Sequence, residues 1–328
     1  MQRPTRRWIR KGYQVRKEKL DSEKGNRPEK RRWIRKPERE YKMDTFYVIT
    51  NYLKDPELET AGYIKEYLEQ KGKKCYIQQR ETKDPLSQYK YTDAQRIPAD
   101  VECALVLGGD GTLLQAARDL VDHPIPLLGI NMGTLGYLAE IECRNIKPAL
   151  DKLITGEFSI EKRMMLHGVA WHQNRQMLSD VALNDIVISR NGRLRVVDFH
   201  VYVDGVYLTS YSADGIIISS PTGSTGYNLS VGGPIVAPQA SLMLLTAIAP
   251  HTLNSRPIVL PEDVEIVIEI ASSHGTDMDG AEATFDGDTS VKLNAGDKIV
   301  ITKSERKVKM IKTKNTSFLE ILREKMNN

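Results

Sequence analysis

Apolar runs and amphipathic segments alternate along the chain from about residue 43 to residue 145. Three apolar runs have the length and composition expected of strands: Phe46–Thr50, Cys103–Leu107 and Ile125–Ile130. Lys74–Gln78 can form a further strand between the first two. Between these strands, apolar residues recur at helical spacing, which predicts amphipathic helices. Strands that alternate with helices predict a parallel, doubly wound sheet in this part of the chain.

Capping signals define the expected helix ends in this region. The Asp55-Pro56 pair predicts an N-cap followed by proline at the first helical position, and Gly72 predicts the end of that helix. A capping box at Thr112–Gln115 predicts a second helix that runs through Val121.

The pattern changes after about residue 158, where short strands and turns follow one another. The expected strands are Leu183–Ser189, Val196–Val203, Val206–Tyr211, Gly215–Ser219, Val264–Ile270, Ser290–Leu293, Lys298–Lys303 and Lys307–Lys312. Asp204-Gly205 predicts a hairpin turn, and the apolar stretch Ala240–Ala249 predicts one helix. A final helix at Ser317–Lys325 has apolar residues on one face, which we expect to pack back on the body.

These patterns predict an α/β, doubly wound N-terminal domain and a β-rich C-terminal domain. We place the first at residues 43–147, completed by a C-terminal helix within 313–328, and the second at 148–312. In 328 residues no apolar run approaches the ~18–20 residues that a membrane span needs. The three cysteines, Cys75, Cys103 and Cys143, are far apart and odd in number, which indicates reduced, buried thiols in the cytoplasm.

The net charge of +4 conceals two regions of opposite sign. Residues 1–42 hold 17 Lys/Arg and 6 Asp/Glu, and the remaining 30 basic and 37 acidic residues give the body a charge of −7. The tail repeats RRWIRK at Arg6–Lys11 and Arg31–Lys36 and has too few aliphatic residues to fold alone. One interpretation is a nucleic-acid or anionic-membrane arm anchored by its tryptophans; the other is a disordered extension that starts upstream of the true start codon.

The segment Gly108-Gly-Asp-Gly-Thr112 lies between a predicted buried strand and a predicted helix. A glycine turn before a helix N-terminus offers free backbone N–H groups to an anion, so this turn is a candidate phosphate site. A carboxylate such as Asp110 repels phosphate, which leaves it two roles: holding Mg²⁺ or accepting a proton from an attacking hydroxyl. The alternative is a tight strand-to-helix turn in which Asp110 acts as a local cap. The sequence has neither a Walker A pattern nor GxGxxG followed by a ribose-binding acid.

Other polar residues stand at the ends of predicted strands. The loop Pro221–Tyr227 carries four hydroxyl groups and two glycines, which suits a ribose or phosphate pocket but also a plain Ser/Thr-rich turn. Asn184-Asp185 and Asp214-Gly215 have side chains that accept hydrogen bonds from ribose hydroxyls. Turn motifs are the alternative for both pairs.

Five segments, taken in order, resemble the NAD kinase family from about Met43 to the C-terminus. They are GGDGT at 108–112, NMGTLGYL at 131–138, LNDIVISR at 183–190, DGIIISSPTGSTGYNLSVGGP at 214–234 and HTLNSRP at 251–257. The motif GGDGT also occurs in lipid kinases and phosphofructokinases. The long SSPTGSTGYNLS stretch does not suit those enzymes.

The resemblance implies transfer of the terminal phosphoryl group of ATP, or of polyphosphate in some members, to the 2′-hydroxyl of the adenosine ribose of NAD, which gives NADP. Asp110 matches the proton acceptor of the family. The implied substrate-binding residues are Gly108, Gly109, Gly111, Thr112, Tyr137, Asn184, Asp185, Arg195, Asp214, Thr222, Thr225, Gly226, Tyr227, Asn228 and Ser230. Mg²⁺ or another divalent cation is expected with ATP, without a dedicated protein cage. The family also implies a homodimer or homotetramer, in which the counterpart of Asp214 contacts the nicotinamide side, in some members across the subunit boundary.

Several positions depart from the family pattern. Asp185 is one methylene shorter than the usual Glu, Gly226 replaces the usual Ala, Tyr137 stands where Phe is usual, and Ser212 stands where a basic residue is often found. No residue matches the late C-terminal contact of the family securely.

Two other functions compete with this one. A lipid or sugar kinase would share the fold, although the acidic body argues against a lipid surface. A dinucleotide sensor without turnover would share the binding residues, although the presence of Asp110 argues against it. Binding of nucleic acid through the tail is compatible with either.

Overall fold

The computed structural model describes residues 42–79, 91–133, 136–139, 141–192, 196–252, 254–271, 280–314 and 317–327. These residues belong to one compact unit, Lys42–Asn328. Residues 1–41 of the basic tail and Arg195 lie outside the described residues, so the interpretations made for them stay predictions.

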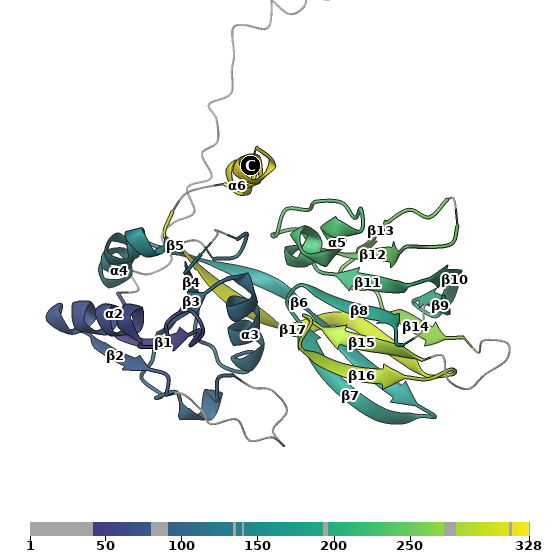
Figure 1. The fold of residues 1–328 in the computed structure, drawn as a ribbon, viewed down its shortest axis with the longest axis horizontal. Coiled ribbons are helices and arrows are strands. Elements are labelled where there is room, and N and C mark those ends of the chain that lie inside the picture. Colours follow the sequence, from purple (N-terminus) through teal and green to yellow (C-terminus); the bar gives the residue numbers. More distant parts are fainter. Residues whose placement is uncertain are drawn as a thin grey trace, which may run out of the picture. The chain divides into compact units, whose positions relative to one another are not determined.

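Four parallel strands form the centre of the N-terminal half (Figure 1). They are β1 (Thr45–Thr50), β2 (Lys74–Ile77), β3 (Cys103–Gly108) and β4 (Leu127–Asn131), in the order β4-β3-β1-β2. The predicted parallel, doubly wound sheet is confirmed. The chain leaves β1 for β2 on one side and returns to β3 on the other, so the topological switch point lies between β1 and β3. Ligands of doubly wound sheets bind outside the carboxyl ends of the strands at such a point.

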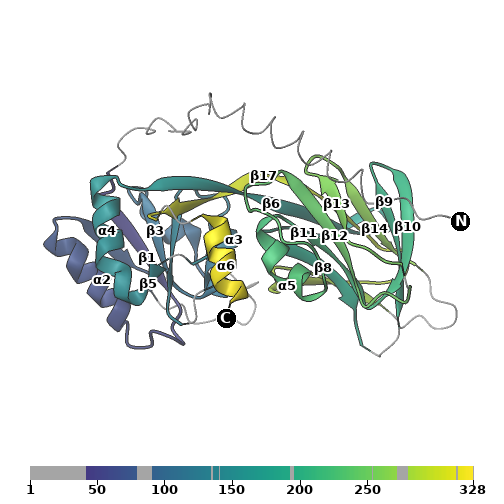
Figure 2. The same ribbon diagram turned by 90° about the horizontal axis from the view of Figure 1, so that it is seen from above.

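Helices cover both faces of this sheet, as Figure 2 shows. The helices α2 (Glu59–Gln70) and α4 (Ile146–Thr155) share a core with Val48 and Leu105, whereas α3 (Asp110–Asp119) shares a core with Tyr47 and Val106. Successive side chains of a strand point to opposite faces, so each strand contributes to both cores.

The start predicted for α2 is wrong by three residues. The helix begins at Glu59, after Leu58, which adopts a φ of 57°. Asp55 nevertheless satisfies the helix N-terminus, because its carboxylate accepts hydrogen bonds from the amides of Thr60 and Ala61 at 3.0 Å each. The capping residue was identified from the sequence, but the chain makes an additional turn between it and the helix.

The start predicted for α3 is also wrong. The helix begins at Asp110 with Gly109 as its N-cap, so Thr112 lies in the first turn and no Thr112–Gln115 capping box forms. The Thr112 hydroxyl instead accepts a hydrogen bond from the Asn51 side chain at 3.2 Å.

Two packed sheets build the C-terminal half. The long strands β6 (Ser159–His172) and β17 (Lys298–Lys312) pair with each other, and β17 also pairs in parallel with β4, so one sheet of eleven described strands passes through both halves (Figure 1). Its other strands are β5 (Ile141–Glu142), β7 (Arg175–Ala182), β9 (Val197–Val203), β10 (Val206–Ala213) and β14 (Ile266–Ile270). The second sheet has the order β13-β12-β11-β8-β15-β16, with β8 (Asp185–Arg190), β11 (Gly215–Ser219), β12 (Leu242–Ile248), β13 (Ile258–Pro261), β15 (Ala281–Phe285) and β16 (Thr289–Leu293).

A continuous apolar core lies between the two sheets and explains one wrong prediction. The stretch Ala240–Ala249 is not a helix, because Leu242–Ile248 forms the strand β12, with six of its seven residues buried. An apolar run without a period fits either element, and here burial on both faces selects the strand. Lys298–Lys303 and Lys307–Lys312 are one strand with an irregularity between Lys303 and Lys307.

Two local predictions are confirmed. Asp204 and Gly205 turn between β9 and β10 with φ values of 50° and 75°, as a two-residue hairpin requires. The C-terminal helix α6 (Phe318–Met326) begins with a capping box between Ser317 and Glu320. No described residue of α6 is fully buried, so its predicted packing on the body is partial.

Cysteine burial follows the prediction at two of three positions. Cys75 and Cys103 are buried, whereas Cys143 is exposed, because it opens a short 3-10 helix after β5. Within the described part of the chain, no helix combines the length and the apolar character that crossing a membrane requires.

Arg118, on α3, connects the two halves of the molecule. Its side chain is 6% exposed, and its guanidinium donates to the Val181 carbonyl at 3.1 Å, to Asp180 at 2.6 Å and to Asp288 at 3.0 Å. A buried guanidinium needs such partners to offset its desolvation. The contacts fix α3 against β7 and against the turn between β15 and β16.

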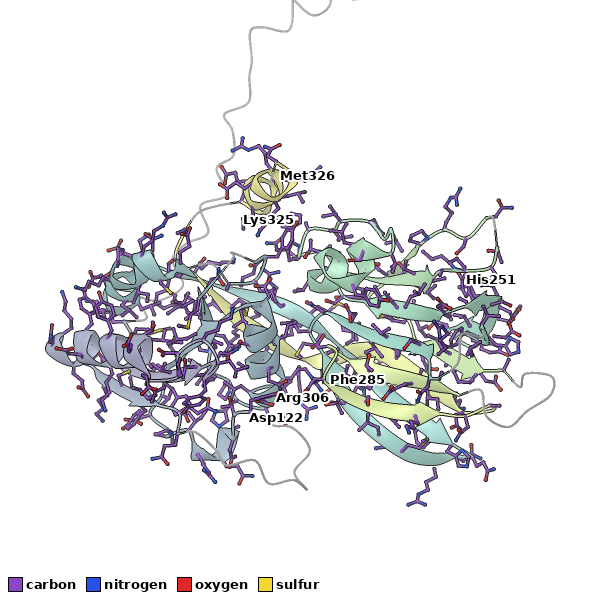
Figure 3. All side chains as sticks on the ribbon, in the orientation of Figure 1. Asp122, His251, Phe285, Arg306, Lys325 and Met326 are labelled. Carbon is purple, nitrogen blue, oxygen red and sulfur yellow. The ribbon has the colours of Figure 1, made fainter. Side chains whose placement is uncertain are left out.

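We expect Arg118→Met to lower the free energy of unfolding by about 2–4 kcal/mol, because it leaves two partly buried carboxylates without their cation. Urea denaturation followed by circular dichroism measures the change. The matched control is Arg306→Met, which removes an exposed ion pair with Asp122 (Figure 3) and should cost less than about 1 kcal/mol. Equal losses in both variants would contradict the bridging role of Arg118.

Candidate active site

The Asp110 carboxylate stands at the N-terminus of α3 and holds the segment 136–139. Its Oδ2 accepts a hydrogen bond from the Tyr137 amide at 2.8 Å, and its Oδ1 accepts from the amides of Leu138 and Ala139 at 3.2 and 3.1 Å. Gly136 lies so close that a Cβ there would overlap the carboxylate. A carboxylate has about four acceptor positions, so the three amides fix its orientation and leave acceptor capacity on Oδ2.

The glycine turn before α3 leaves its backbone amides accessible. A Cβ on Gly108 would overlap the Thr112 side chain, which explains why this strand ends in glycine. Gly109 is the N-cap of α3, and no atom lies within 4 Å of the position that a Cβ on Gly111 would take. The first amides of a helix have no intrahelical acceptor, so this turn can bind an anion.

A second carboxylate organises the segment before β8. Asp286 accepts hydrogen bonds from the amides of Leu183, Asn184 and Asp185 at 2.7, 2.8 and 3.1 Å. The Asn184 carbonyl accepts a further hydrogen bond from the Ser220 amide at 2.8 Å. The Asn184-Asp185 pair is therefore held on both sides.

The loop that follows β11 lies against this pair. It consists of a 3-10 helix, Thr222–Thr225, and the short helix α5 (Tyr227–Ser230). A Cβ on Gly226 would lie 3.3 Å from the Asn184 Nδ2 and 3.6 Å from the Asp185 Oδ2. The structure thus brings together four sequence-predicted positions: Asn184, Asp185, Thr222 and Gly226.

Two buried polar atoms of this group have no hydrogen-bond partner among the described residues. They are the Oδ1 of Asn184 and the Oγ1 of Thr222. An unsatisfied buried polar atom costs about 1–3 kcal/mol. A ligand hydroxyl that reaches these atoms would remove that cost, so they are the strongest candidates for ligand contacts in this half of the site.

A shared hydrophobic cluster joins the Asp110 region to the Asn184 region. Leu113 on α3, Leu138 beside the Asp110 carboxylate and Leu183 before Asn184 belong to the same buried cluster. No hydrogen bond among the described residues links Asp110 directly to Asn184. Asp110 and Asn184 therefore lie around one hydrophobic core, and neither side chain uses the hydrogen-bonding atoms of the other.

Other predicted site residues have different surroundings. Asn228 is fully buried, and its amide donates to the carbonyls of Ser224 and Pro234 and accepts from Thr246. Its side chain therefore supports the loop from inside the protein, and a contact between Asn228 and the dinucleotide stays a prediction.

Predicted contacts on the exposed side of the loop remain open to a ligand. Tyr227 is 46% exposed, Ser230 is exposed and Thr225 is half-buried. Asp214 forms an ion pair with Arg190, with 2.9 Å between Oδ1 and Nε. A ligand at Asp214 would therefore contact a carboxylate that is already paired with the Arg190 guanidinium.

Burial changes the acid–base properties of the two carboxyl groups near β8. Burial, and then the negative charge of Asp286, raise the pKa of Asp185 to about 7. Burial also raises the pKa of Asp286 to about 6, although the three amides and Arg118 act in the opposite direction. Asp185 therefore changes its charge near neutral pH.

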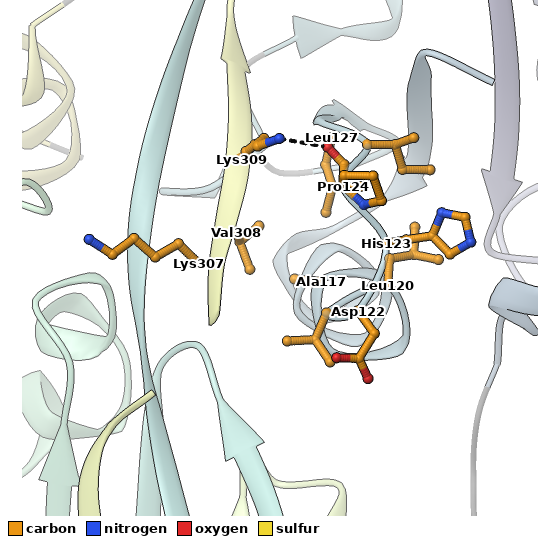
Figure 4. A pocket seen from close by; sticks show the side chains of 11 residues that line it. Ala117, Leu120, Asp122, His123, Pro124, Leu127, Lys307, Val308 and Lys309 are labelled. Atoms are coloured by element: carbon orange, nitrogen blue, oxygen red, sulfur yellow. Dashed lines mark hydrogen bonds between the residues drawn. The ribbon is translucent and has the colours of Figure 1, made fainter. Parts of the chain in front are cut away.

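A cavity of about 240 Å³ lies elsewhere, at the C-terminal end of α3 (Figure 4). Ala117, Leu120, His123 and Val308 are among its lining residues. Asp110 opens the same helix, and ten helical residues span roughly 15 Å. This cavity is therefore separate from the candidate active site.

The sequence did not reveal several residues that shape the site. Asp286 and Arg118 act through partners that are far away in sequence, and Gly136 matters because of its approach to Asp110. Asn51 follows β1, and Asn131 is the last residue of β4. Polar residues at the carboxyl ends of parallel strands are candidates for a ligand site, and this position is the signal that would have identified both as site residues.

Comparison with known proteins gives consistent matches along the chain. A family model described as the ATP-NAD kinase N-terminal domain matches residues 42–158, and one described as the ATP-NAD kinase C-terminal domain matches residues 183–313. The NAD kinase of Lachnospira eligens is 44% identical over 293 residues, which cover 87% of this chain and 100% of that protein. The NAD kinase of Lachnoclostridium phytofermentans is 43% identical over 288 residues, with 87% and 100% covered.

Solved structures support the fold. A yeast NADH kinase complexed with NADH has a TM-score of 0.75 at 23% identity and covers 87% of this chain and 88% of that chain. An NAD kinase from Archaeoglobus fulgidus in complex with ATP has a TM-score of 0.67 at 23% identity, with 86% and 98% covered. The predicted α/β domain followed by a β-rich domain is confirmed.

The raised pKa of Asp185 predicts a pH-dependent stability. The folded protein keeps a proton on Asp185 that the unfolded chain releases near pH 4, so this group's contribution to stability falls as pH rises from about 4 to about 7. We expect Asp185→Asn to stabilise the protein more, relative to the native chain, at pH 8 than at pH 5.

Urea denaturation at both pH values measures this difference, with the exposed Asp263→Asn as the matched control. A stability difference between Asp185→Asn and the native chain that stays constant from pH 5 to pH 8 would refute the burial argument.

Proposed function

This chain belongs to the NAD kinase family of phosphotransferases, and we propose that it phosphorylates NAD at the site formed by Asp110, the glycine turn and the Asn184-Asp185 segment. The acceptor is the 2′-hydroxyl of the adenosine ribose, and the product is NADP. The observation that carries this assignment is the Asp110 carboxylate, fixed by three amides at the N-terminus of α3.

Asp110 orients the acceptor hydroxyl in this mechanism. Its Oδ2 takes part in one amide contact, to Tyr137, and keeps capacity for a hydrogen bond from the ribose 2′-hydroxyl. As the ribose oxygen forms its bond to the terminal phosphorus of ATP, the hydroxyl proton moves to Asp110 and ADP leaves with the electrons of the broken P–O bond. Phosphoryl transfer has a loose transition state, so positioning contributes more than base strength.

The Asn184 region holds the dinucleotide. The unpartnered Asn184 Oδ1 and Thr222 Oγ1 supply acceptors for ribose hydroxyls, and the exposed ring of Tyr227 offers a surface on which a planar ring stacks. Asp185 adds a carboxyl group that is partly protonated at neutral pH and can then donate a hydrogen bond. These contacts present the ribose to Asp110.

A divalent cation that arrives bound to the phosphates of ATP fits this site. Among the described residues, no three His, Cys, Asp or Glu side chains gather into a metal site, and Asp110 is the acid that the glycine turn itself contributes. That donor set suits Mg²⁺ held mainly by phosphate oxygens and water. When bound, the ion neutralises charge on the phosphates, while the amides of the turn position them.

We also propose that the protein forms a homodimer or homotetramer. Support comes from the outer strand β10, which exposes Val206, Tyr207 and Leu208 by 69%, 54% and 40%. Contiguous exposed apolar residues on an edge strand, which has a neighbour on one side alone, favour association with a second copy. ATP as the donor, rather than polyphosphate, is likewise a proposal.

We expect the purified protein to form NADP from NAD and ATP, and Asp110→Asn to lose about 10²–10⁴-fold in kcat while its Kd for NAD stays within a few-fold. A coupled assay for NADP and calorimetric titration with NAD measure the two effects. Binding without turnover in the native protein would favour the sensor interpretation.

The matched control for this variant is Asp119→Asn at the other end of α3. Asp119 is buried, whereas Asp110 is half-buried, and the Asp119 carboxylate accepts from the Thr92 amide and from Gln115. This control should lose stability but keep its turnover. Equal turnover in Asp110→Asn and the native protein would remove Asp110 from the mechanism.

A further inference from the structure

Lys54 lies in the turn that follows β1, and its backbone is held firmly. The Lys54 amide donates to the Asn51 carbonyl at 2.8 Å, and the next residue, Asp55, is buried beneath the turn with its carboxylate bound to the N-terminus of α2. The turn belongs to the carboxyl end of β1, beside the topological switch point of the sheet. The lysine thus starts from a fixed position at the edge where ligands bind.

The Lys54 ammonium lies between two glycine turns. Its Nζ would be 3.5 Å from a Cβ on Gly109 and 3.4 Å from a Cβ on Gly133. Gly109 follows β3 and caps α3, and Gly133 follows β4. The cation therefore meets the carboxyl ends of three neighbouring strands, at positions where the absence of side chains leaves the backbone accessible.

The Gly133 turn is itself fixed from below. The Asn131 side chain is 2% exposed and donates to the Gly133 carbonyl at 2.7 Å, while its Oδ1 has no hydrogen-bond partner among the described residues. A buried, partly unsatisfied amide is an unusual support for a surface turn. It holds the second glycine in place opposite the first.

Lys54 is exposed, and no carboxylate among the described residues forms an ion pair with its ammonium. The Lys54 ammonium makes no hydrogen bond or ion pair among the described residues, and the carboxylates of Asp55 and Asp110 are bound to backbone amides. A cation beside the N-terminus of α3 also faces the positive end of the helix dipole, which is unfavourable on its own. An anion between the ammonium and the helix amides would satisfy both.

We propose that Lys54 binds the phosphate chain of the phosphoryl donor, together with the amides of the glycine turn. The inference rests on the proposed function, because it places the donor at the N-terminus of α3. A lysine ammonium is a compact charge with three donors and binds phosphate without demanding a fixed geometry. Lys54 would hold the donor phosphates while Asp110 orients the acceptor hydroxyl.

The test compares donor binding in Lys54→Met and in the native protein. Calorimetric titrations with ADP and with inorganic tripolyphosphate should each show binding about 10- to 100-fold weaker in the variant, the range expected for loss of one charge-assisted hydrogen bond. The KM for ATP should rise, whereas the Kd for NAD should change less than about twofold. Lys54→Arg should restore part of the donor affinity, because it restores the charge.

The matched control is Lys65→Met, which removes an exposed lysine on α2 that pairs with Glu69. It should leave donor binding unchanged. Thermal unfolding and NAD binding show whether Lys54→Met is folded. If it is not folded, Lys54→Gln replaces it in the phosphate titrations.

Unchanged affinity for both ADP and tripolyphosphate in a folded Lys54 variant would overturn the inference, even if the native protein makes NADP. If the native protein makes no NADP from NAD and ATP, the proposed function fails. The Lys54 inference is still decided by the phosphate titrations.

Discussion

The buried guanidinium of Arg118 is the interaction on which the geometry of the site depends. It lies on the same helix as Asp110, and it binds Asp180 and Asp288 on the other half of the molecule. Asp288 is two residues from Asp286, the carboxylate that holds the Asn184-Asp185 segment. Movement of α3 would therefore displace Asp110, the proposed proton acceptor, relative to the groups proposed to hold the ribose. The shared sheet also crosses between the halves through β6 and β17, so the two parts of the site form on one continuous sheet.

Fixed charges organise the loops around this support. Asp110 accepts from three backbone amides of the segment 137–139, and Asp286 accepts from three amides where the chain enters β8. Charge-assisted hydrogen bonds of this kind order loops without large apolar cores. The positive groups lie close together. The Lys54 Nζ would be 3.5 Å from a Cβ on Gly109, and Gly109 is the N-cap of α3. A phosphate chain bound between these groups would offset both positive charges.

The sequence was most informative where signals are local. Apolar strand runs, the Asp204-Gly205 turn and the glycine turn at Gly108 were predicted because a few neighbouring residues determine them. The stretch Ala240–Ala249 was misassigned, because a strand buried on both faces has no period of two. Asp286 and Arg118 were not predicted, because their partners are more than 60 residues away. Asn228 was assigned to the ligand by resemblance, whereas packing with Thr246 uses its side chain inside the protein.

The most direct test of the account is a crystal structure of the protein with NAD and a non-hydrolysable ATP analogue. The account predicts that the 2′-oxygen of the adenosine ribose lies about 2.6–3.2 Å from the Asp110 carboxylate, with the donor phosphates against the amides of Gly109–Thr112. A 2′-hydroxyl that faces a different side chain, with Asp110 contacting only the amides of residues 137–139, would contradict it.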